Sequence, residues 1–353
     1  MKGEEKILLS HGGGGKETSE LINGLLFKEL YGPAVSGNAK SLSLLEDAAI
    51  IKIGSSPSKI AFTTDSFTVN PLFFKGGDIG KLCVAGTVND LSVMGAKPLF
   101  LSLGLIIEEG FSFNNLKNIM KSIALEASKT GIAVVAGDTK VVPLGKADGI
   151  FINTSGIGEV LYENISVYNI KEGDVIIVSG HVGDHGSAIM SLREGIDMDV
   201  DIESDCASLW GMIDSVLKTG VHVGAMRDAT RGGIAAVLNE WAQAAGAEIF
   251  IDEGKIPVKN AVKGFCELLG FEPYQLACEG RAVFAVRPGF EKKALKTLKS
   301  HPLGKNAEII GFVQKRGGAG YGKSPGGRVI LKGIFGVNRV MEAPSGELLP
   351  RIC

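Results

Sequence analysis

The 353-residue sequence lacks the signatures of several large protein classes. It contains no CxxC pair, and its five cysteines are widely spaced, which argues against a disulfide framework and against a zinc site. No run of about 18 apolar residues occurs, and the N-terminus has no long apolar segment, so neither a membrane span nor a signal peptide is predicted. The net charge of −2 favours neither nucleic acid nor an anionic membrane as a partner. We therefore expect a reduced, soluble, cytoplasmic protein.

What the sequence does contain is enough apolar material for two domains. Hydrophobic residues make up 45% of the chain, and the 49 glycines imply many tight turns and close backbone approaches. Neither half shows a clean alternation of strands and helices, so an α+β fold is favoured over a doubly wound sheet. We expect a glycine-rich arm over residues 1–40, a domain over 41–165, a second over 166–337 and a mobile tail over 338–353.

Hydrophobic periodicity locates the main elements of both halves. In the first half it predicts strands at 48–53, 59–64, 99–107, 132–136 and 149–159, and helices at 19–31, 78–94 and 114–129. In the second half it predicts strands at 175–178, 248–251 and 281–286, and helices at 232–245, 258–269 and 290–300. The glycine-rich segment 315–333 carries five basic residues, but it is short and is better interpreted as a connection between strands than as a nucleic-acid tract.

Five aspartates occupy settings in which an unpaired carboxylate is costly: Asp47, Asp65, Asp90, Asp138 and Asp228. Two of them follow apolar strands, one precedes a strand, one lies on the apolar face of a helix and one opens a helix. A single such aspartate is usually a helix cap or a partner in a salt bridge. Several together favour a shared cation, and their hard oxygen ligands point to Mg²⁺, which also binds substrate phosphates.

Two segments are suited to binding phosphate. Gly12, Gly13, Gly14 and Gly15 are followed by Lys16, which offers exposed N–H groups and a cation, although the segment does not have the spacing of a P-loop. The second segment, Thr230, Arg231 and Gly232, opens a predicted helix, whose free N–H groups attract anions. Alone, the first is more often a flexible arm. Together with the aspartates, the two segments favour Mg-ATP as the ligand.

Cys353 is the last residue of the sequence and follows Pro350, Arg351 and Ile352. Two interpretations are open from the residues alone. The thiol could sit by accident on a frayed end, since chain termini are commonly disordered. Alternatively, it could be the carrier of a covalently bound group on a swinging tail.

Several motifs together resemble the HypE family of hydrogenase maturation proteins. The family belongs to the aminoimidazole ribonucleotide synthetase-like superfamily, to which the internal motifs are common, whereas the Pro-Arg-Ile-Cys ending is much more specific. The matching stretches span almost the whole chain. They are His11–Gly15, Thr63–Phe67, Gly77–Gly80, Gly86–Leu91, Ala136–Lys140, Ala229–Gly233 and Pro350–Cys353, and Thr64 in the second is a further candidate for binding ATP.

The resemblance implies a fold, a ligand and a reaction. It implies two α+β domains whose N-terminal domains pair in a homodimer, with ATP in a groove near that interface and the glycine arm over it. The five aspartates would be the candidates for coordinating Mg²⁺. A carbamoyltransferase partner, HypF, would load a carbamoyl group onto Cys353. ATP-dependent dehydration would then convert it to an S-cyanated cysteine, and a HypC–HypD complex would receive the cyanide for the iron of a [NiFe] hydrogenase.

Loss of both carbamoyl N–H protons requires a base near the docked tail. Our candidates are Glu279, which could instead pair with Arg281, and Lys140, which could instead be a solvated loop lysine. With the resemblance, Lys140 is better interpreted as steadying the phosphoryl group. Two other functions stay open. One is a different ATP-using enzyme of the superfamily, either a small-molecule kinase or a selenophosphate synthetase. The latter normally has a reactive cysteine or selenocysteine near the glycine arm, and here no cysteine precedes Cys83, which counts against it. The other is a non-catalytic, ATP-gated assembly scaffold.

Overall fold

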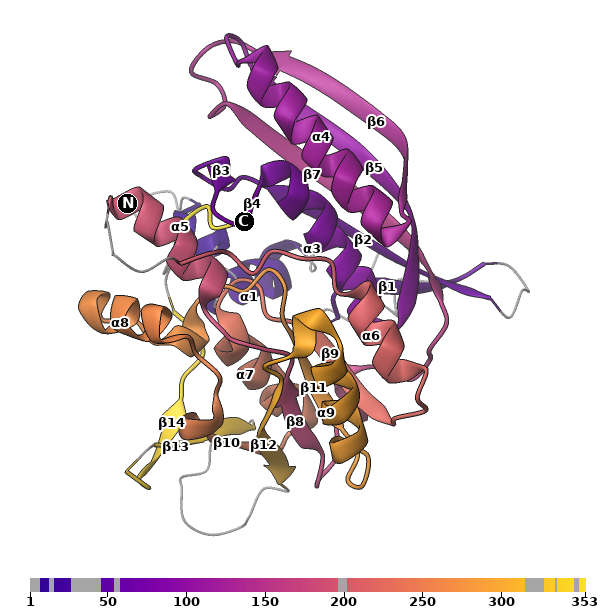
Figure 1. Ribbon diagram of the computed structural model, residues 1–353, viewed down its shortest axis with the longest axis vertical. Helices are drawn as coiled ribbons and strands as arrows, with labels where there is room; N and C mark the ends of the chain where they lie inside the picture. Colours follow the sequence, from indigo (N-terminus) through magenta and orange to yellow (C-terminus); the bar gives the residue numbers. More distant parts are fainter. Residues whose placement is uncertain are drawn as a thin grey trace.

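The computed structural model describes residues 7–12, 16–26, 46–53, 58–195, 202–314, 327–333, 335–345 and 349–353. Two sheets with their helices make up the two halves of the molecule, one above the other in Figure 1. The prediction of a two-domain α+β fold is confirmed. In the described part of the chain, no helix combines the length and the apolar character needed to cross a membrane.

The first half is built on a five-stranded sheet in the order β1-β2-β7-β5-β6. Its strands are β1 (Ala49–Lys52), β2 (Lys59–Phe67), β5 (Ala96–Glu108), β6 (Ala133–Val142) and β7 (Ile150–Val160). Only β5 and β6 pair in parallel, because α4 (Phe113–Thr130) connects them; the other neighbours are antiparallel. Helices α3 (Ile79–Val93) and α4 pack on one side of this sheet, with a small hairpin of β3 (Phe73–Phe74) and β4 (Gly77–Asp78) beside α3.

The opposite face of the first sheet carries exposed apolar side chains. In β2 and β5 buried and exposed residues partly alternate, and the exposed set includes Phe62, Phe100 and Ile106. The edge strand β6 is exposed along almost its whole length. An antiparallel sheet commonly leaves one face to water, but that face is then usually polar. The apolar outer face is therefore a candidate contact surface.

The second half is built on a seven-stranded sheet in the order β14-β13-β10-β12-β8-β11-β9. Its strands are β8 (Val175–Val178), β9 (Val223–Asp228), β10 (Glu248–Asp252), β11 (Ala282–Val286), β12 (Glu308–Gln314), β13 (Arg328–Lys332) and β14 (Asn338–Met341). The helices of this half are α5 (Asp184–Glu194), α6 (Trp210–Leu217), α7 (Gly233–Ala245), α8 (Asn260–Leu269) and α9 (Glu291–Ser300). Its largest core cluster centres on Trp241 and the apolar residues of the central strands.

Helix α3 joins the two halves. It begins at Asp78, whose carboxylate accepts hydrogen bonds from the amides of Gly80 and Lys81, and almost all of its residues are buried. Gly80 permits close packing on α4, because a Cβ at this position would lie 2.4 Å from the carbonyl oxygen of Ile119. On its other side α3 contacts β9 and α6 of the second half. The helix thus brings its polar residues to the boundary between the halves.

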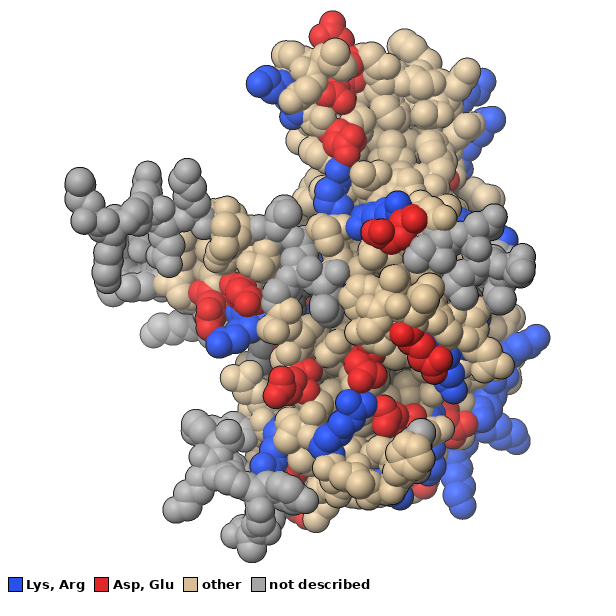
Figure 2. Space-filling model, turned by 90° about the vertical axis from the view of Figure 1, so that its left-hand side faces the viewer, with Lys and Arg blue, Asp and Glu red and all other residues tan. Residues whose placement is uncertain are grey.

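The surface is electrically mixed. Figure 2 shows acidic and basic side chains interspersed over one face of the molecule, rather than gathered into one large field of a single sign. This pattern agrees with the net charge of −2.

Several predicted elements differ from the structure. The strand predicted at 132–136 continues to Val142, which places Asp138 within β6 rather than at its end. Residues 338–341 were expected in the mobile tail, but they form β14, antiparallel to β13. The helix predicted at 19–31 begins earlier as α1 (Lys16–Leu21), continues as a short π-helical turn to Leu26, and its remainder lies outside the described residues. Strand β9 and helices α5 and α6 were not predicted.

Candidate functional site

A cavity of about 230 Å³ lies between the two halves, where β2 and α3 face the end of β9. Acidic, basic and hydroxyl side chains dominate its wall, and the final cysteine also lines it. The lining residues are Glu46, Asp47, Thr63, Thr64, Asp65, Ser66, Phe67, Gly86, Asp90, Arg227, Asp228, Thr230, Arg231, Glu279 and Cys353.

Local packing explains why α3 and β2 present their side chains to the same space. Gly86 and Asp90 are four residues apart on α3 and therefore share a face. A Cβ at Gly86 would lie 2.9 Å from the ring of Phe67, so glycine allows β2 to approach the helix. Asp90 accepts a hydrogen bond from the Thr63 hydroxyl across this contact, at 2.7 Å.

The second half supplies the end of β9 and the turn before α7. Strand β9 ends at Asp228, and the turn contains two glycines with positive φ, +77° at Gly232 and +58° at Gly233. A Cβ at Gly233 would lie 2.6 Å from the carbonyl oxygens of Tyr274 and Leu276, so the turn needs glycine for space as well as for conformation. This turn carries Thr230 and Arg231 to the cavity wall.

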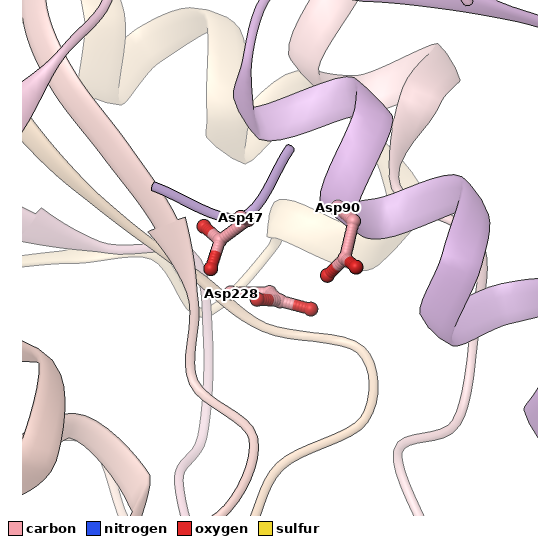
Figure 3. A group of neighbouring side chains, drawn as sticks. All are labelled: Asp47, Asp90 and Asp228. Carbon is pink, nitrogen blue, oxygen red and sulfur yellow. The ribbon is translucent and has the colours of Figure 1, made fainter. Parts of the chain in front are cut away.

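Three aspartates from separate elements form a compact oxygen cluster. Asp47 precedes β1, Asp90 comes from α3 and Asp228 ends β9. One carboxylate oxygen of each lies within 4.8 Å of the others. Figure 3 shows the three carboxylates grouped around a common space. Hard oxygen atoms in this arrangement suit a divalent cation such as Mg²⁺.

The electrostatics of the cluster also call for a cation. Burial is the main cause that raises the pKa of Asp47 and of Asp90 well above the ordinary value, and nearby carboxylates raise both further. Burial, opposed by Arg227, raises the pKa of Asp228 to about 7. One buried oxygen of Asp47 and one of Asp228 have no hydrogen-bond partner among the described residues. These residues therefore fit a metal ion, which would neutralise charge and occupy the unpaired oxygens.

Arg227 compensates only part of this charge. Its Nε lies 2.6 Å from Asp47 Oδ1, and its Nη1 lies 2.8 Å from a carboxylate oxygen of Glu240. Glu46 is bound outside the cluster, because its carboxylate accepts hydrogen bonds from the Ser166 hydroxyl and the amide of Val167. Asp65 stays close to Asp90, and burial raises the pKa of its carboxyl as well.

Cys353 reaches the same cavity through the docked tail. Burial raises the pKa of its thiol to about 12, and Arg231 acts in the opposite direction. Glu279 also lines the cavity, and burial followed by the charge of Asp228 raises its pKa well above normal. One of its carboxyl oxygens is buried without a hydrogen-bond partner in the described structure. The negative charges of Cys353 and Asp65 raise the pKa of Arg231, which shows that its guanidinium interacts with this end of the cavity.

The main chain on either side of Glu279 is held firmly. Its amide donates to Asp205 Oδ1 at 3.1 Å, and its carbonyl oxygen accepts from the amide of Ala207 and from the side chain of Asn89. Asn89 is the neighbour of Asp90 on α3, so the glutamate and the aspartate cluster are supported by the same helix. The expected alternative pairing of Glu279 with Arg281 is not seen: Arg281 binds main-chain oxygens and lies near Asp184 and Asp205.

The phosphate-binding predictions have mixed outcomes. Arg231 donates a hydrogen bond to the carbonyl oxygen of Gly12 at 3.0 Å, which brings this part of the arm to the cavity. Gly13, Gly14 and Gly15 lie outside the described residues. Lys16 is exposed and pairs with Glu20. Gly232 shapes the turn before α7 but does not line the cavity.

Asp138 and Lys140 are not part of this cavity. Both are exposed on β6, where Lys140 Nζ lies 3.0 Å from Asp138 Oδ2, and the hydrogen bond to Lys140 lowers the pKa of Asp138. They line a second hollow of about 250 Å³ on the outer face of the sheet. Ser66 lines both spaces. Within one protomer, therefore, the structure does not bring Asp138 to the other aspartates, because β6 is the edge strand farthest from β2 in sheet order.

Sequence reasoning missed several cavity residues, chiefly Glu46, Thr63, Ser66, Phe67 and Arg227. Arg227 had a signal, since it directly precedes Asp228 at the end of an apolar strand. Ser66 follows Asp65 in the same way. For Glu46 and Phe67 the sequence offers no comparable signal, because their place depends on contacts with distant segments.

Comparisons with known proteins place this geometry in a family. Residues 45–160 match the N-terminal domain model of AIR synthase related proteins, and residues 171–322 match the C-terminal domain model. Carbamoyl dehydratase HypE of Escherichia coli is 44% identical over 349 residues, covering 98% of this chain and 99% of that protein. The chain belongs to the HypE family. The resemblance found in the sequence is thereby confirmed.

Solved structures of the HypE family agree with the fold. A chain of a HypE–HypF complex has 45% identity and a TM-score of 0.82, covering 92% of this chain and 99% of that chain. A HypE structure in complex with ATP has 38% identity and a TM-score of 0.80, covering 99% of this chain and 100% of that chain. The overall fold is thus shared with these HypE structures over at least 92% of this chain.

Proposed function

We propose that the chain is an ATP-dependent dehydratase that converts a carbamoyl group on its own Cys353 into a cyano group for hydrogenase maturation. The observation that carries this proposal is the location of Cys353 in one cavity with the aspartate cluster, Arg231 and Glu279. A carbamoyl group on the thiol would lie among these side chains. The names of the HypE relatives support the same activity.

ATP and Mg²⁺ are the ligands that the cavity suits. The solved complex of a HypE with ATP supports ATP as the nucleotide. We propose that Asp47, Asp90 and Asp228 hold Mg²⁺, with Asp65 beside them, and that Arg231 and Thr230 contact phosphate. The bound ion would supply charge neutralisation during phosphoryl transfer. The glycine arm, which reaches Arg231 through Gly12, would then lie over the nucleotide.

The reaction needs one phosphoryl transfer and the loss of two protons. Transfer of the γ-phosphoryl group to the carbamoyl oxygen makes that oxygen a good leaving group, and phosphate departs as the nitrile forms. We propose that Glu279 accepts the N–H protons. Its raised pKa reflects the nearby carboxylates as well as burial, so a cation on the aspartates would favour its ionised, basic form.

The tail reaches the cavity within its own protomer. The amide of Thr68 donates to a main-chain oxygen of Cys353 at 2.9 Å, and the amide of Asn70 donates to the carbonyl oxygen of Arg351. Ile352 is buried in the core cluster of the first half. We therefore propose docking in cis, with Cys353 leaving this position to be loaded and unloaded.

We also propose that the protein is a homodimer through the apolar outer face of the first sheet. Phe100 is 45% exposed and Ile106 is 44% exposed in the protomer, which is more apolar surface than a solvated sheet face usually carries. Asp138 and Lys140 lie on this same side of the molecule. In a symmetric pair each copy would bring them to the partner copy, where Lys140 would steady the phosphoryl group.

Two external partners complete the cycle. A carbamoyltransferase of the HypF type would load Cys353, and the solved HypE–HypF complex supports this assignment. A HypC–HypD complex would accept the cyano group, a role that stays a prediction from the family resemblance. The cytoplasmic location also stays a prediction.

The alternatives differ in what they do with ATP. A small-molecule kinase would release ADP without any modification of Cys353, and a scaffold would release none. We expect ADP release only when Cys353 carries a carbamoyl group, with one ADP per carbamoyl group in a single turnover. Incubation of the protein with carbamoyl phosphate and ATP, in the presence and in the absence of HypF, would measure ADP release. ADP release independent of HypF would overturn the proposal.

A further inference from the structure

The last four residues of the chain are held by their main chain. The main-chain oxygen of each residue from Pro350 to Cys353 accepts at least one hydrogen bond. The donors for Arg351 and Cys353 include the amides of Asn70 and Thr68. The donors for Pro350, Arg351 and Ile352 also include two side chains of a single helix, α5. Figure 1 shows the C-terminal end of the chain beside α5 and the β3–β4 hairpin.

His185, near the start of α5, binds the last peptide before the cysteine. Its Nε2 lies 2.8 Å from the carbonyl oxygen of Ile352, and its Nδ1 lies 2.8 Å from the Ser204 hydroxyl. A carbonyl oxygen can only accept, so Nε2 must carry the proton. In a neutral ring Nδ1 is then an acceptor, and the Ser204 hydroxyl donates to it. The histidine is completely buried against the ring of Phe74, which favours this neutral form.

Arg193, near the end of α5, binds the two preceding peptides. Its Nη1 donates to the carbonyl oxygen of Pro350 and its Nη2 to that of Arg351. Its Nε donates to the carbonyl oxygen of Asn70, in the segment that also pairs with the tail. The planar guanidinium therefore joins the tail to the first half of the molecule, a geometry that a lysine cannot reproduce.

These contacts make the undocked state of the tail unfavourable. If the tail leaves, the buried Nε2–H of His185 loses its acceptor, and a buried unsatisfied donor is costly. The guanidinium of Arg193 loses two charge-assisted bonds at the same time. Because all of these bonds are made to main-chain oxygens, they depend on the path of the tail and leave the thiol of Cys353 free for chemistry.

We propose that His185 and Arg193 are positioning residues that hold the tail carbonyls and set the fraction of time that Cys353 spends in the cavity. This inference rests on the proposed carrier role of Cys353. Neither side chain lines the cavity, so neither is assigned to the chemical step. Ser204 supports His185 by fixing the tautomer that can donate to Ile352.

Alkylation of the Cys353 thiol tests the inference without using catalysis. The other four cysteines, Cys83, Cys206, Cys266 and Cys278, are buried, so iodoacetamide should modify Cys353 first. We expect Arg193→Ala to speed alkylation of Cys353 at least about tenfold, since it removes two charge-assisted hydrogen bonds. Arg193→Lys should be alkylated at a rate between those of the wild type and Arg193→Ala, because lysine keeps the positive charge but not the planar guanidinium that donates two hydrogen bonds. Peptide mass spectrometry would follow the rate at Cys353.

His185 provides the second test. His185→Gln keeps an N–H donor near the position of Nε2 and should alkylate at close to the wild-type rate, whereas His185→Leu should alkylate several-fold faster. Ser204→Ala removes the tautomer support without altering the histidine, and a rate between these two is expected. Arg339→Ala is the matched control, since Arg339 pairs on the surface with Glu253 and Glu272 rather than with residues 350–353.

Thermal unfolding of each variant separates positioning from a general loss of structure. Faster alkylation with a wild-type unfolding temperature and wild-type ATP affinity supports the inference. Wild-type alkylation rates in folded Arg193→Ala and His185→Leu would overturn it, and so would faster alkylation that tracks a lowered unfolding temperature. A protein that docks its tail as described but forms no cyanated cysteine would refute the proposed function and leave this inference intact.

Discussion

Asp228 shows most clearly that burial in the cavity opposes ionisation of the aspartates. Its pKa of about 7, raised mainly by burial, lies well above the value near 3.9 expected in the unfolded chain. Between these values the folded state binds more protons than the unfolded state, so the contribution of Asp228 to stability falls as pH rises from about 4 to 7. Ionisation of this aspartate therefore destabilises the metal-free protein.

Magnesium should reverse this loss. We expect added Mg²⁺ to raise the unfolding temperature more at pH 8, which is above the pKa of Asp228, than at pH 5, where protons compete with the ion for this carboxylate. Asp228→Asn should raise the unfolding temperature of the metal-free protein at pH 8 by about 2 °C or more and abolish the response to Mg²⁺. Differential scanning calorimetry would measure both effects.

The exposed Glu109 gives the matched control for removal of a carboxylate charge. Glu109→Gln should leave the metal-free unfolding temperature and the magnesium response unchanged. An equal response to Mg²⁺ at pH 5 and pH 8, or a full response in Asp228→Asn, would contradict a metal site at this cluster.

Substitution of Glu279 should impair dehydration without weakening ATP binding. Because its raised pKa favours the neutral form in the metal-free protein, Glu279→Gln is nearly isosteric and should cost little stability. We expect wild-type ATP affinity but a dehydration rate lowered at least about 100-fold, since a positioned base contributes on that scale. Intact mass spectrometry should then show an S-carbamoyl adduct that persists. Normal turnover by this variant would remove Glu279 from the role of base.

At the residue scale, the sequence predicted most of the cavity. Asp47, Asp65, Asp90 and Asp228 were recognisable because each sits beside or within an apolar segment, where a carboxylate is costly unless it has a partner. The cavity collects all four. The contrast with Asp138 is informative, because the apolar run before it looked like a buried strand. The run belongs instead to an exposed edge strand, and burial of an edge depends on neighbours that periodicity does not reveal.

At the element scale, the segment between Glu279 and β11 is fixed by a very close backbone approach. A Cβ at Gly280 would lie 1.9 Å from the carbonyl oxygen of Asp205. Gly280→Ala should therefore displace the Glu279 main chain from Asp205 and lower the unfolding temperature, by several degrees for a cost of about 1–3 kcal/mol. Dehydration should fall with it. Calorimetry and the dehydration assay would measure the two effects.

The same substitution in an open helical position should have the opposite sign. Gly264 lies within α8, and nothing approaches the position of its Cβ within 4 Å. Gly264→Ala should raise stability by about 0.5–1 kcal/mol, because alanine has the higher helix propensity, and leave dehydration unchanged. A stable, active Gly280→Ala protein would show that the close approach is not required.

The accuracy of the element predictions followed the strength of local signals. Helix α4 was predicted almost to the residue, because its apolar stripe is clean and Gly131 ends it in the left-handed conformation. Helix α5 was missed because its N-terminal half is buried and polar: Asp184 pairs with Lys259, and His185 contacts Ser204 and the main chain of Ile352. Strand β14 was missed because three of its four residues are exposed, which resembles a solvated tail.

At the scale of the whole molecule, the apolar outer face of the first sheet should be covered by a second copy. Ile106→Asp places a charge on the exposed face of β5, where it would be buried in the dimer. We expect this variant to sediment as a monomer and to lose dehydration if Asp138 and Lys140 act on the partner copy. Analytical ultracentrifugation would measure the change in mass.

Leu268→Asp is the matched control, since Leu268 is also exposed, at 66%, but lies on α8 of the second half. It should sediment as the wild type does. A monomeric wild-type protein with full dehydration activity would contradict the dimer and the role of Lys140 together.

Local sequence patterns predicted least about how the two halves and the tail are arranged in space. The fold class and the two-domain plan followed from composition and motifs, and the family from motifs spread along the chain. That the tail crosses back to lie between α5 and the segment near Thr68 depends on hydrogen bonds between residues almost 300 positions apart, such as Thr68 to Cys353. No periodicity reports such contacts. They are nevertheless what places the thiol beside Glu279 and the aspartates.

The most direct test of the account is the mass of the C-terminal peptide after a single turnover. The protein would be incubated with HypF, carbamoyl phosphate, Mg²⁺ and ATP, then digested, with Cys353→Ala as the matched variant. We predict that the peptide containing Cys353 gains the mass of one cyano group in place of one hydrogen, and that Cys353→Ala binds ATP but gains nothing. An unmodified Cys353, or a cyano group on another residue, would contradict the central claim.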